Sequence, residues 1–457
     1  MIHSILEKLR GGYPLKKAIK PLYFIAMTLI FCFVSTASLW ADETQNNFSI
    51  DAKAAIAVDA DTGKIFYAQD STTPLPIASI TKVLSVYVVY DQIKNGQLNL
   101  QDQVVISPEL AELSTKPDLS NVALVANQAY SVESLIHASL IQSANAAVMA
   151  LGEKVAGSQE QFVNMMRQKA ESLGITDAKI ISVSGLNNHD IGDFRYPGTG
   201  DDEENEMSAQ DVAIIAKQFI ADYPEALNIT STVQENFGEN TAQPSTMQNW
   251  NQLLPGLSLQ KDGVIGLKTG TTDLAGACFV GVIRQNNRQI ITVVLHANNQ
   301  ANDSNARFVE TSKLMDYALN QWQEITLSDT DLTAAIQSKL AVIDGKQASV
   351  DLKIADSYKL WVPIPFDIKQ LKYEEQLEVQ SIQAPVQTNK EVGTLTISNP
   401  TDNYGYLPNT QTSEIQMRIV TANSVEKENF FFLWLRQVKN VAQNAWMHTK
   451  QFFQNIF

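Results

Sequence analysis

Cysteine is nearly absent from this chain, which has only two among its 457 residues. Cys32 lies in an N-terminal segment that we expect to be removed, so the mature chain would keep Cys278 alone. A single cysteine cannot form an internal disulfide bond. An exported protein of this length can do without one if its hydrophobic cores are large.

Positive charge is also scarce. The chain has 34 Lys and Arg against 49 Asp and Glu, which gives a formal net charge of −15 at pH 7. A surface that binds nucleic acid needs an excess of Lys and Arg, so the composition argues against such a partner. The sequence indicates no cofactor. It supports no metal site, because the five scattered histidines lack the spacing of zinc ligands: His3, His137, His189, His296 and His448.

The first 41 residues have the pattern of a secretory signal peptide. Five basic residues precede an apolar run over residues 22–34, and a small residue that suits cleavage follows at Ala41. Bulky residues just before Ala41 make this cleavage site imperfect, so a retained membrane anchor is the alternative. We expect export, with residues 1–41 removed.

The C-terminal segment lacks the run of about twenty apolar residues that a membrane-spanning helix needs. Over residues 430–457 its apolar residues recur at steps of three and four, with polar and basic residues such as Arg436 and Lys439 between them. This spacing predicts an amphipathic helix. Its aromatic-rich face favours a helix that lies in the membrane interface, and docking on the protein's own core is the alternative. We assign residues 423–457 to this anchor.

Between its ends the chain has two regions of different pattern. Residues 48–323 begin and end with strand patterns and have helical periodicity between them. This order predicts an α+β domain in which one antiparallel sheet packs against helices, with a hairpin near residues 278–295. Over residues 324–422, short alternating runs broken by Gly, Pro and Asn predict a small all-β domain.

Ser79 and Lys82 form an S-x-x-K pattern at the expected start of a long apolar helix. A helix N-terminus stabilises negative charge, and one helical turn places Lys82 on the same face as Ser79. A lysine that is buried, or beside another cation, loses its proton more easily and can act as a base. The pattern alone is weak evidence because it recurs at Ser258 and Ser424, where nothing else suggests catalysis.

Two further motifs strengthen the catalytic interpretation. Ser143-Ala144-Asn145 offers a hydroxyl that can relay a proton and an amide that can hold a substrate carbonyl or a lysine. If this motif stood alone, a helix cap would be the favoured interpretation. Lys268-Thr269-Gly270 lies at the start of the expected hairpin. Its lysine and hydroxyl could bind a carboxylate, while the glycine would let a substrate backbone approach the strand edge closely.

In this order and with these wide gaps, the three motifs resemble those of penicillin-binding proteins and serine β-lactamases. The flanks "PIASITK" and "GLKTGTTDLAG", the β-rich region and the C-terminal helix make the chain similar to the low-molecular-weight penicillin-binding proteins, the serine-type D-alanyl-D-alanine carboxypeptidases of peptidase family S11. The resemblance runs from about residue 48 to the C-terminus. It implies a serine β-lactamase/transpeptidase-like α+β domain, followed by a small all-β domain and an amphipathic helix.

The resemblance also implies a mechanism. Ser79 would attack the carbonyl between the two terminal D-alanines of a peptidoglycan stem peptide and form an acyl-enzyme, which water would then hydrolyse. Lys82 would be the base, Ser143 would pass a proton to the leaving nitrogen, and Asn145 would orient the substrate and Lys82. β-Lactam antibiotics would acylate Ser79 and leave slowly.

The third motif would bind the substrate in this scheme. Lys268 and Thr269, with Gly270 beside them, would receive the terminal carboxylate, and the charge of Lys268 would help to keep Lys82 neutral. Backbone N–H groups of Ser79 and Thr271 would form the oxyanion hole.

Three alternatives stay open on the sequence. A β-lactamase would share the motifs, but residues 144–267 contain no E-x-x-L-N run that could supply its deacylating glutamate, and we predict that the acidic run 201–206 is a solvated loop. A D,D-endopeptidase of peptidoglycan cross-links would also have the same motifs. A membrane-attached wall-binding protein with a decayed site is the non-enzyme alternative.

The two ends together predict where the protein works. An exported chain with an interfacial helix would be a peripheral or monotopic protein on the outer face of the bacterial cytoplasmic membrane. The β-rich domain would then lift the active site towards the cell wall.

Overall fold

The computed structural model describes residues 48–454, and the predicted signal peptide over residues 1–41 lies outside them. The chain divides into two units, of which the second begins at Ile50. The description below concerns the described part of that second unit.

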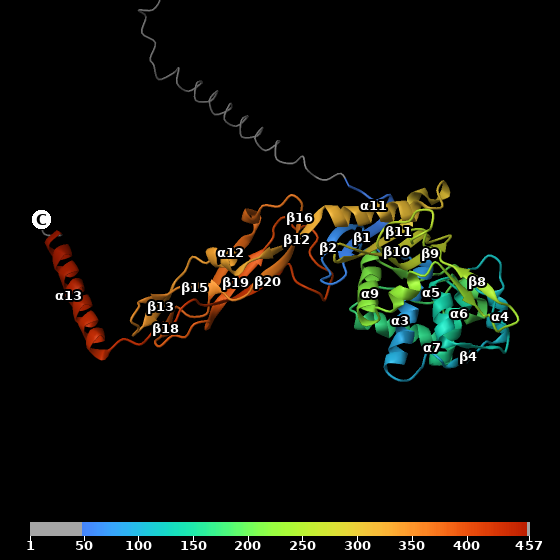
Figure 1. Cartoon of the computed structure of the whole chain (residues 1–457), viewed down its shortest axis with the longest axis horizontal. Helices are drawn as coiled ribbons and strands as arrows, with labels where there is room; N and C mark the ends of the chain where they lie inside the picture. The colour runs from blue at the N-terminus through green and yellow to red at the C-terminus, as the bar shows by residue number, and fades with distance from the viewer. Residues whose placement is uncertain (1–47, 455–457) are drawn as a thin grey trace, which may run out of the picture. The chain divides into compact units, whose positions relative to one another are not determined.

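A five-stranded antiparallel sheet forms the centre of the N-terminal region (Figure 1). Its order is β2-β1-β11-β10-β9, so β1 pairs with β11, which lies more than two hundred residues later in the chain. The middle strands are buried and apolar on both faces because helices cover both sides of the sheet. The strands are β1 (Ala52–Asp59), β2 (Ile65–Gln69), β9 (Val264–Thr272), β10 (Gly276–Gln285) and β11 (Arg288–Ala297).

Helices pack against this sheet, which confirms the predicted α+β arrangement. Helix α11 (Ala306–Asn320) lies on one side of the sheet and α9 (Ala209–Asp222) on the other (Figure 1). Helix α3 (Thr81–Lys94) is buried at every position from Thr81 to Tyr90. A helix that is apolar all round belongs in a protein interior, and α3 is the element that positions Lys82.

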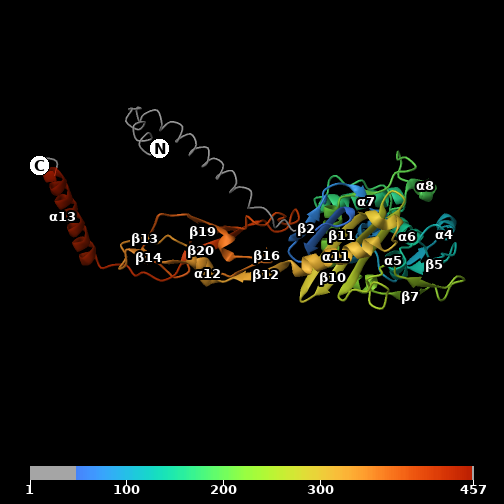
Figure 2. The same cartoon turned by 90° about the horizontal axis from the view of Figure 1, so that it is seen from above.

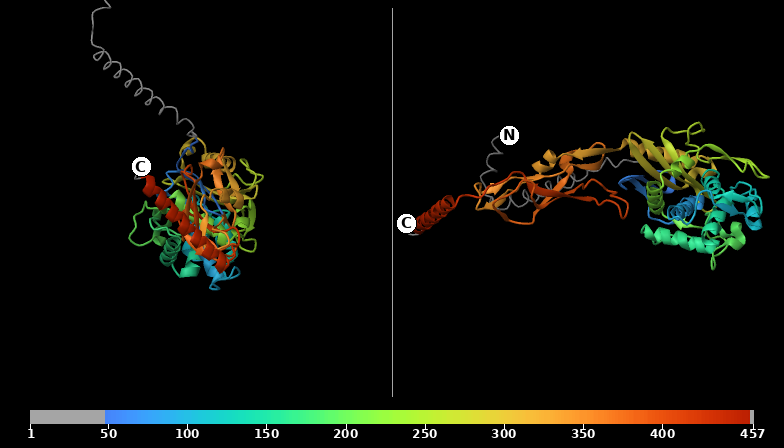
Figure 3. Two further views of the ribbon diagram at one scale, coloured as in Figure 1. Left: turned by 90° about the vertical axis from the view of Figure 1, so that its left-hand side faces the viewer. Right: turned by 60° about the horizontal axis from the view of Figure 1, so that its bottom comes forward.

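The remaining helices and short strands of this region gather beside the sheet (Figures 2 and 3). Ser131 caps α5, because its side chain accepts a hydrogen bond from the N–H of Ser134. The elements are β3 (Leu75–Pro76), η2 (Ala78–Ile80), β4 (Gln103–Val105), α4 (Pro108–Ser114), β5 (Ala129–Ser131), α5 (Val132–Leu140), α6 (Asn145–Ala156), α7 (Gln159–Ser172), α8 (Asn188–Ile191), η3 (Gly192–Phe194), β6 (Glu206–Met207), α10 (Ala226–Thr230), β7 (Gln234–Phe237), β8 (Ser245–Gln248) and η4 (Asn298–Ala301).

The C-terminal region is rich in short strands, as predicted, and has its own apolar core. Three small sheets have the orders β12-β16, β14-β13-β18 and β15-β20-β19-β17. The region is not purely β, because Ser328 and Asp331 form a capping box that starts the short helix α12. The elements are β12 (Trp322–Leu327), α12 (Asp329–Ala334), β13 (Leu340–Ile343), β14 (Ser349–Val350), β15 (Leu352–Ile354), β16 (Tyr358–Pro363), η5 (Ile368–Gln370), β17 (Lys372–Leu377), β18 (Ser381–Gln383), β19 (Glu391–Ser398) and β20 (Glu414–Thr421).

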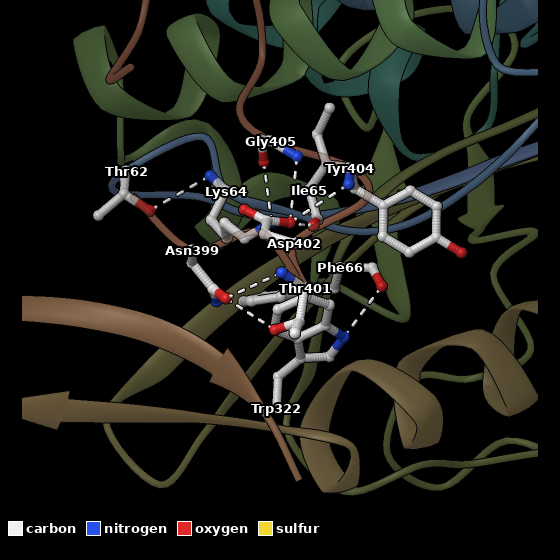
Figure 4. A network of polar contacts seen from close by, with 10 residues as sticks. All are labelled: Thr62, Lys64, Ile65, Phe66, Trp322, Asn399, Thr401, Asp402, Tyr404 and Gly405. Carbon is white, nitrogen blue, oxygen red and sulfur yellow. Dashed lines mark hydrogen bonds and ion pairs between the residues drawn. The ribbon is translucent and has the colours of Figure 1, made fainter. Parts of the chain in front are cut away.

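A buried ion pair joins the two regions (Figure 4). Lys64, in the turn between β1 and β2, lies 2.7 Å from Asp402, in the loop between β19 and β20. Strand β12 crosses the predicted boundary after residue 323, and the side chain of Trp322 donates a hydrogen bond to Phe66. The division into two domains at residue 324 therefore remains a prediction from the sequence.

The C-terminal segment forms one continuous helix, α13 (Phe430–Gln454), drawn in red in Figure 3. Its large apolar side chains are exposed, including Phe430, Trp434 and Trp446. Among residues 48–454, no helix combines the length and the apolar character needed to cross a membrane.

Candidate active site

Ser79 lies in a tight turn that directly precedes α3. The turn η2 (Ala78–Ile80) leaves Ser79 partly exposed at the N-terminal end of that helix. Ala78 has a positive φ of 49°, a conformation that non-glycine residues adopt rarely and mostly where the surrounding structure enforces it. The sequence prediction of a serine at a helix start is confirmed.

Two glycines allow other segments to press against this turn. A Cβ at Gly185 would lie 2.0 Å from the carbonyl oxygen of Ala78, and one at Gly270 would lie 2.5 Å from that of Ile77. Gly185 also has a φ of +81°, which favours glycine. Gly270 thus lets β9 approach the nucleophile turn, a packing reason for this glycine that differs from the predicted approach of substrate.

Lys82 lies one turn along α3, fully buried, with three oxygen atoms around its amine. Nζ lies 2.8 Å from Ser79 Oγ, 2.7 Å from Asn145 Oδ1 and 2.8 Å from the carbonyl oxygen of Ser184. An amide oxygen and a backbone carbonyl can only accept hydrogen bonds, whereas a hydroxyl can also donate. If the amine is neutral, its two N–H groups are therefore taken by Asn145 and Ser184. Its lone pair then faces the hydroxyl of Ser79.

The surroundings of Lys82 favour this neutral form. Burial and, secondarily, the nearby charge of Lys268 hold the pKa of Lys82 well below its ordinary value. The sequence predicted the effect of Lys268 but not that desolvation is the larger cause.

Asn145 and Ser143 come from the break between α5 and α6. The Asn145 amide nitrogen donates to the carbonyl oxygen of Ser120, so its oxygen is left to face Lys82. Ser143 is buried with a φ of +61° and lines the same cavity as Ser79. The structure thus brings the second motif to the first.

The third motif lies on β9, with Lys268 buried and its Nζ donating to the Thr269 carbonyl at 3.0 Å. Burial and, secondarily, the guanidinium of Arg307 lower the pKa of Lys268 to about 7. Arg307 donates from Nη1 to the carbonyls of Gly270 and Cys278, which fixes β9 against α11. The charge of Arg307 on α11 therefore lowers the pKa of Lys268 on β9, and the charge of Lys268 lowers that of Lys82 on α3, in each case in addition to burial.

A cavity of about 450 Å³ opens beside Ser79. It is large enough for a small peptide end and has both polar and aromatic walls. Its lining consists of Ser79, Ser120, Ser143, Trp250, Gln252, Thr269, Thr271, Ser304, Asn305, Arg307 and Phe308. Among residues 48–454, no group of three or more His, Cys, Asp and Glu side chains could hold a metal ion.

Sequence reasoning missed several of these residues. Ser184 acts through its backbone carbonyl and Arg307 carries no motif around it, so neither gave a signal. Trp250 was also missed, although its indole N–H donates to the Gln142 carbonyl and its ring lines the cavity.

The prediction that the acidic run 201–206 is a solvated loop is wrong in part. Asp201 and Asp202 are exposed, but Glu204 and Asn205 are buried. Both find internal partners, and the carboxylate of Glu204 accepts a hydrogen bond from Thr272 at the end of β9. Burial raises the pKa of Glu204.

Comparisons with known proteins show which family the sequence matches. The sequence model of the family Peptidase_S11, described as D-alanyl-D-alanine carboxypeptidase, matches residues 41–299. A D-alanyl-D-alanine carboxypeptidase of Escherichia coli, DacC, is 31% identical over 80% of this chain and 84% of its own. DacF of Bacillus subtilis, with the same description, is 28% identical over 76% of this chain and 81% of its own.

A solved structure is also similar. The peptidoglycan synthesis regulatory factor PBP3 of Streptococcus pneumoniae is 38% identical, with a TM-score of 0.65. The match covers 83% of this chain and all of that one.

Proposed function

Because this chain belongs to the D-alanyl-D-alanine carboxypeptidase family, peptidase S11, we propose that Ser79 is its acylating nucleophile and Lys82 the base. The protein is a serine-type carboxypeptidase and penicillin-binding protein that removes the terminal D-alanine from peptidoglycan stem peptides. The observation that carries the proposal is the buried Lys82 amine at 2.8 Å from Ser79 Oγ.

Acylation begins when neutral Lys82 takes the proton of Ser79 while Oγ attacks the carbonyl carbon between the two terminal D-alanines. The tetrahedral intermediate then collapses, and the bond from that carbon to nitrogen breaks. Ser143 relays the proton from Lys82 to the leaving nitrogen. Free D-alanine departs, and an ester to Ser79 remains.

The negative charges of the tetrahedral intermediate and of the terminal carboxylate need hydrogen-bond donors that are held in fixed positions. Backbone N–H groups of Ser79 and Thr271 stabilise the oxyanion, a kind of interaction worth about 3 kcal/mol per donor. Lys268 and Thr269 bind the terminal carboxylate. Arg307 supports them by holding the backbone of β9.

Hydrolysis of the ester completes the cycle. Lys82, neutral again after the relay, takes a proton from water as the water oxygen attacks the ester carbon. Ser79 leaves with that proton, and the shortened peptide departs as a carboxylic acid, which releases the second proton of the water to solvent as it ionises.

The proposal is tested with the purified chain, a labelled penicillin and a D-Ala-D-Ala pentapeptide. We expect one covalent label per chain, located at Ser79 by peptide mass, and release of D-alanine from the pentapeptide. If neither the covalent penicillin label nor the release of D-alanine is found, the hypothesis that this protein is an enzyme is wrong. Rapid penicillin turnover would indicate a β-lactamase, and cleavage confined to cross-linked dimers would indicate an endopeptidase.

The pH dependence follows from two lysines. On the acid side kcat/KM falls as Lys82 takes up a proton, at a pH well below the ordinary lysine value. On the alkaline side Lys268, whose pKa burial and Arg307 lower to about 7, loses the charge that holds the carboxylate. Bound carboxylate favours charged Lys268, so this limb moves to higher pH in kcat.

The variant Lys268→Arg is the control for that profile. Its guanidinium keeps its proton to a pH of about 12 or above, so the alkaline limb should disappear from kcat/KM. An unchanged alkaline limb in this variant would assign that limb to another group.

We further propose that α13 holds the enzyme at the outer face of the cytoplasmic membrane. Support comes from its exposed Phe430, Trp434 and Trp446, which suit a helix in the membrane interface. A chain that ends at Asn423 is expected to move from the membrane to the soluble fraction of cells and to keep its penicillin label. If the shortened chain stays with the membrane, another segment holds it there.

A further inference from the structure

Asn205 lies in the acidic run, yet its side chain is fully buried. Its carboxamide makes four hydrogen bonds. Oδ1 accepts from the N–H groups of Ile181 and Ser182 at 2.7 and 2.9 Å. Nδ2 donates to Thr81 Oγ1 at 3.0 Å and to the Ser182 carbonyl at 2.8 Å. The two donors and both lone pairs of the amide are therefore used.

This residue contacts both sides of the proposed catalytic pair. Its backbone carbonyl accepts from the N–H of Ile77, two residues before Ser79. Its amide reaches Thr81, the neighbour of Lys82 at the start of α3. The same amide holds the segment that leads to Ser184, whose carbonyl accepts from Lys82.

Other hydrogen bonds also hold that segment, among them those of Ser184 Oγ with Ser182 Oγ and with the N–H of Leu186. Residues 181–186 form neither helix nor strand. Besides Asn205, Ser85 Oγ donates to the Val183 carbonyl at 2.7 Å, and Ser182 Oγ accepts from the N–H of Gly185 at 3.1 Å. Asn205 contributes three hydrogen bonds to this segment, more than the side chain of any of these serines.

The position of the Ser184 carbonyl decides where the Lys82 lone pair points. With Asn145 and Ser184 as acceptors of its two N–H groups, the neutral amine must present its lone pair to Ser79. If the Ser184 carbonyl moved away, an N–H could turn towards Ser79, and the amine would be a poorer base for that proton.

We propose that Asn205 is a positioning residue, which aims the Lys82 lone pair at Ser79 by holding the Ser184 carbonyl and the nucleophile turn in register. The inference rests on the proposed roles of Ser79 and Lys82. Asn205 itself touches neither substrate nor reacting atoms. Its effect should therefore fall on the rate of acylation rather than on binding.

The test compares Asn205→Ala with Asn188→Ala. Asn188 is a matched control because it is also buried and holds the acidic loop by donating to Thr199 and Gly200, but it has no contact with Lys82. Labelling by penicillin over a range of concentrations separates the rate of acylation from the dissociation constant of the encounter complex. We expect Asn205→Ala to slow acylation by about 10²-fold, because misplaced reacting groups cost about that much, with binding unchanged. Asn188→Ala should leave both unchanged.

The pH profile of the acylation rate gives a second readout. Burial is the main cause of the low pKa of Lys82, so water admitted by Asn205→Ala should move the acid limb to higher pH. The cations beside it, Lys268 and Arg307, are the same in both variants. If Asn205→Ala fails to fold, Thr81→Val is the second variant, because it removes only one of the four hydrogen bonds of the Asn205 amide. It should slow acylation and move the acid limb to higher pH, each by less than Asn205→Ala.

The outcomes separate the inference from the function on which it rests. Wild-type chain without any label would overturn the proposed roles of Ser79 and Lys82. A labelled wild type, with Asn205→Ala equal to Asn188→Ala in rate and in acid limb, would overturn the role of Asn205 alone.

Discussion

Replacement of Lys82 by methionine is expected to slow acylation of Ser79 by about 10²- to 10⁴-fold, the range that a general base contributes. Methionine has a similar length but no lone pair that can take the serine proton. The hydroxyl of Ser79, 2.8 Å from Nζ in the wild type, would keep its proton and stay a weak nucleophile. Stopped-flow measurement of penicillin labelling gives the rate.

The variant Lys82→Arg separates the base from its charge. Arginine can donate to Asn145 and Ser184 as the lysine does, but it keeps its proton at every accessible pH. We expect it to be as slow as Lys82→Met. An arginine variant that acylates at close to the wild-type rate would show that Lys82 acts by its charge, and the assignment of the base would be wrong.

The results for these two variants also bear on how the site keeps Lys82 neutral. A buried amine with three oxygen neighbours would normally hold its proton, since each oxygen can accept from an ammonium group. Desolvation and the charge of Lys268 act against that tendency. Burial and, secondarily, Arg307 make Lys268 itself easier to deprotonate. The charge of Lys268 therefore has two effects in the proposed mechanism. It binds the substrate carboxylate, and it favours the neutral form of Lys82.

The sequence predicted those parts of the fold and site that depend on local pattern. Alternating apolar runs identified the β10–β11 hairpin, and the S-x-x-K spacing placed Ser79 and Lys82 on one helical turn. Each of these depends on residues close together in the chain.

What could not be predicted depends on distant segments meeting. The acidic run has the composition of a solvated loop, but Glu204 and Asn205 are buried because β6 pairs with β3 beside the nucleophile turn. No sequence motif around Arg307 indicates that its guanidinium lies beside β9. The acceptor from Ser184 is a backbone carbonyl, which every residue possesses, so no residue type could mark it.

A second large effect is expected on stability, from the buried ion pair shown in Figure 4. Lys64 has no exposed surface, and its Nζ lies 2.7 Å from Asp402 and 4.6 Å from the centre of the Trp322 ring. The change Asp402→Ala leaves this cation without its counter-charge. Loss of one partner of a buried pair costs about 3–5 kcal/mol in the free energy of unfolding. Urea unfolding, followed by the emission of Trp322 and the other tryptophans, measures the loss.

The pH dependence of that loss has a definite sign. Burial lowers the pKa of Lys64 and Asp402 raises it, so removal of Asp402 should lower it further. Between that lowered value and the ordinary lysine pKa of about 10.4, the unfolded chain binds more protons than the folded chain. The free energy of unfolding of Asp402→Ala should therefore rise with pH across this window and recover part of the loss.

Asp351→Ala is the matched control, since Asp351 also lies 2.7 Å from a lysine, Lys339, but both side chains are more than half exposed. An exposed pair contributes about 0–1 kcal/mol, so this variant should unfold close to the wild type at every pH. If Asp402→Ala behaves like Asp351→Ala, the hydrogen bonds from Lys64 to the carbonyls of Ile65 and Gly405 suffice to hold its charge. If instead the predicted loss and its recovery at high pH are found together, the charge of Asp402 is what stabilises the contact between the two regions.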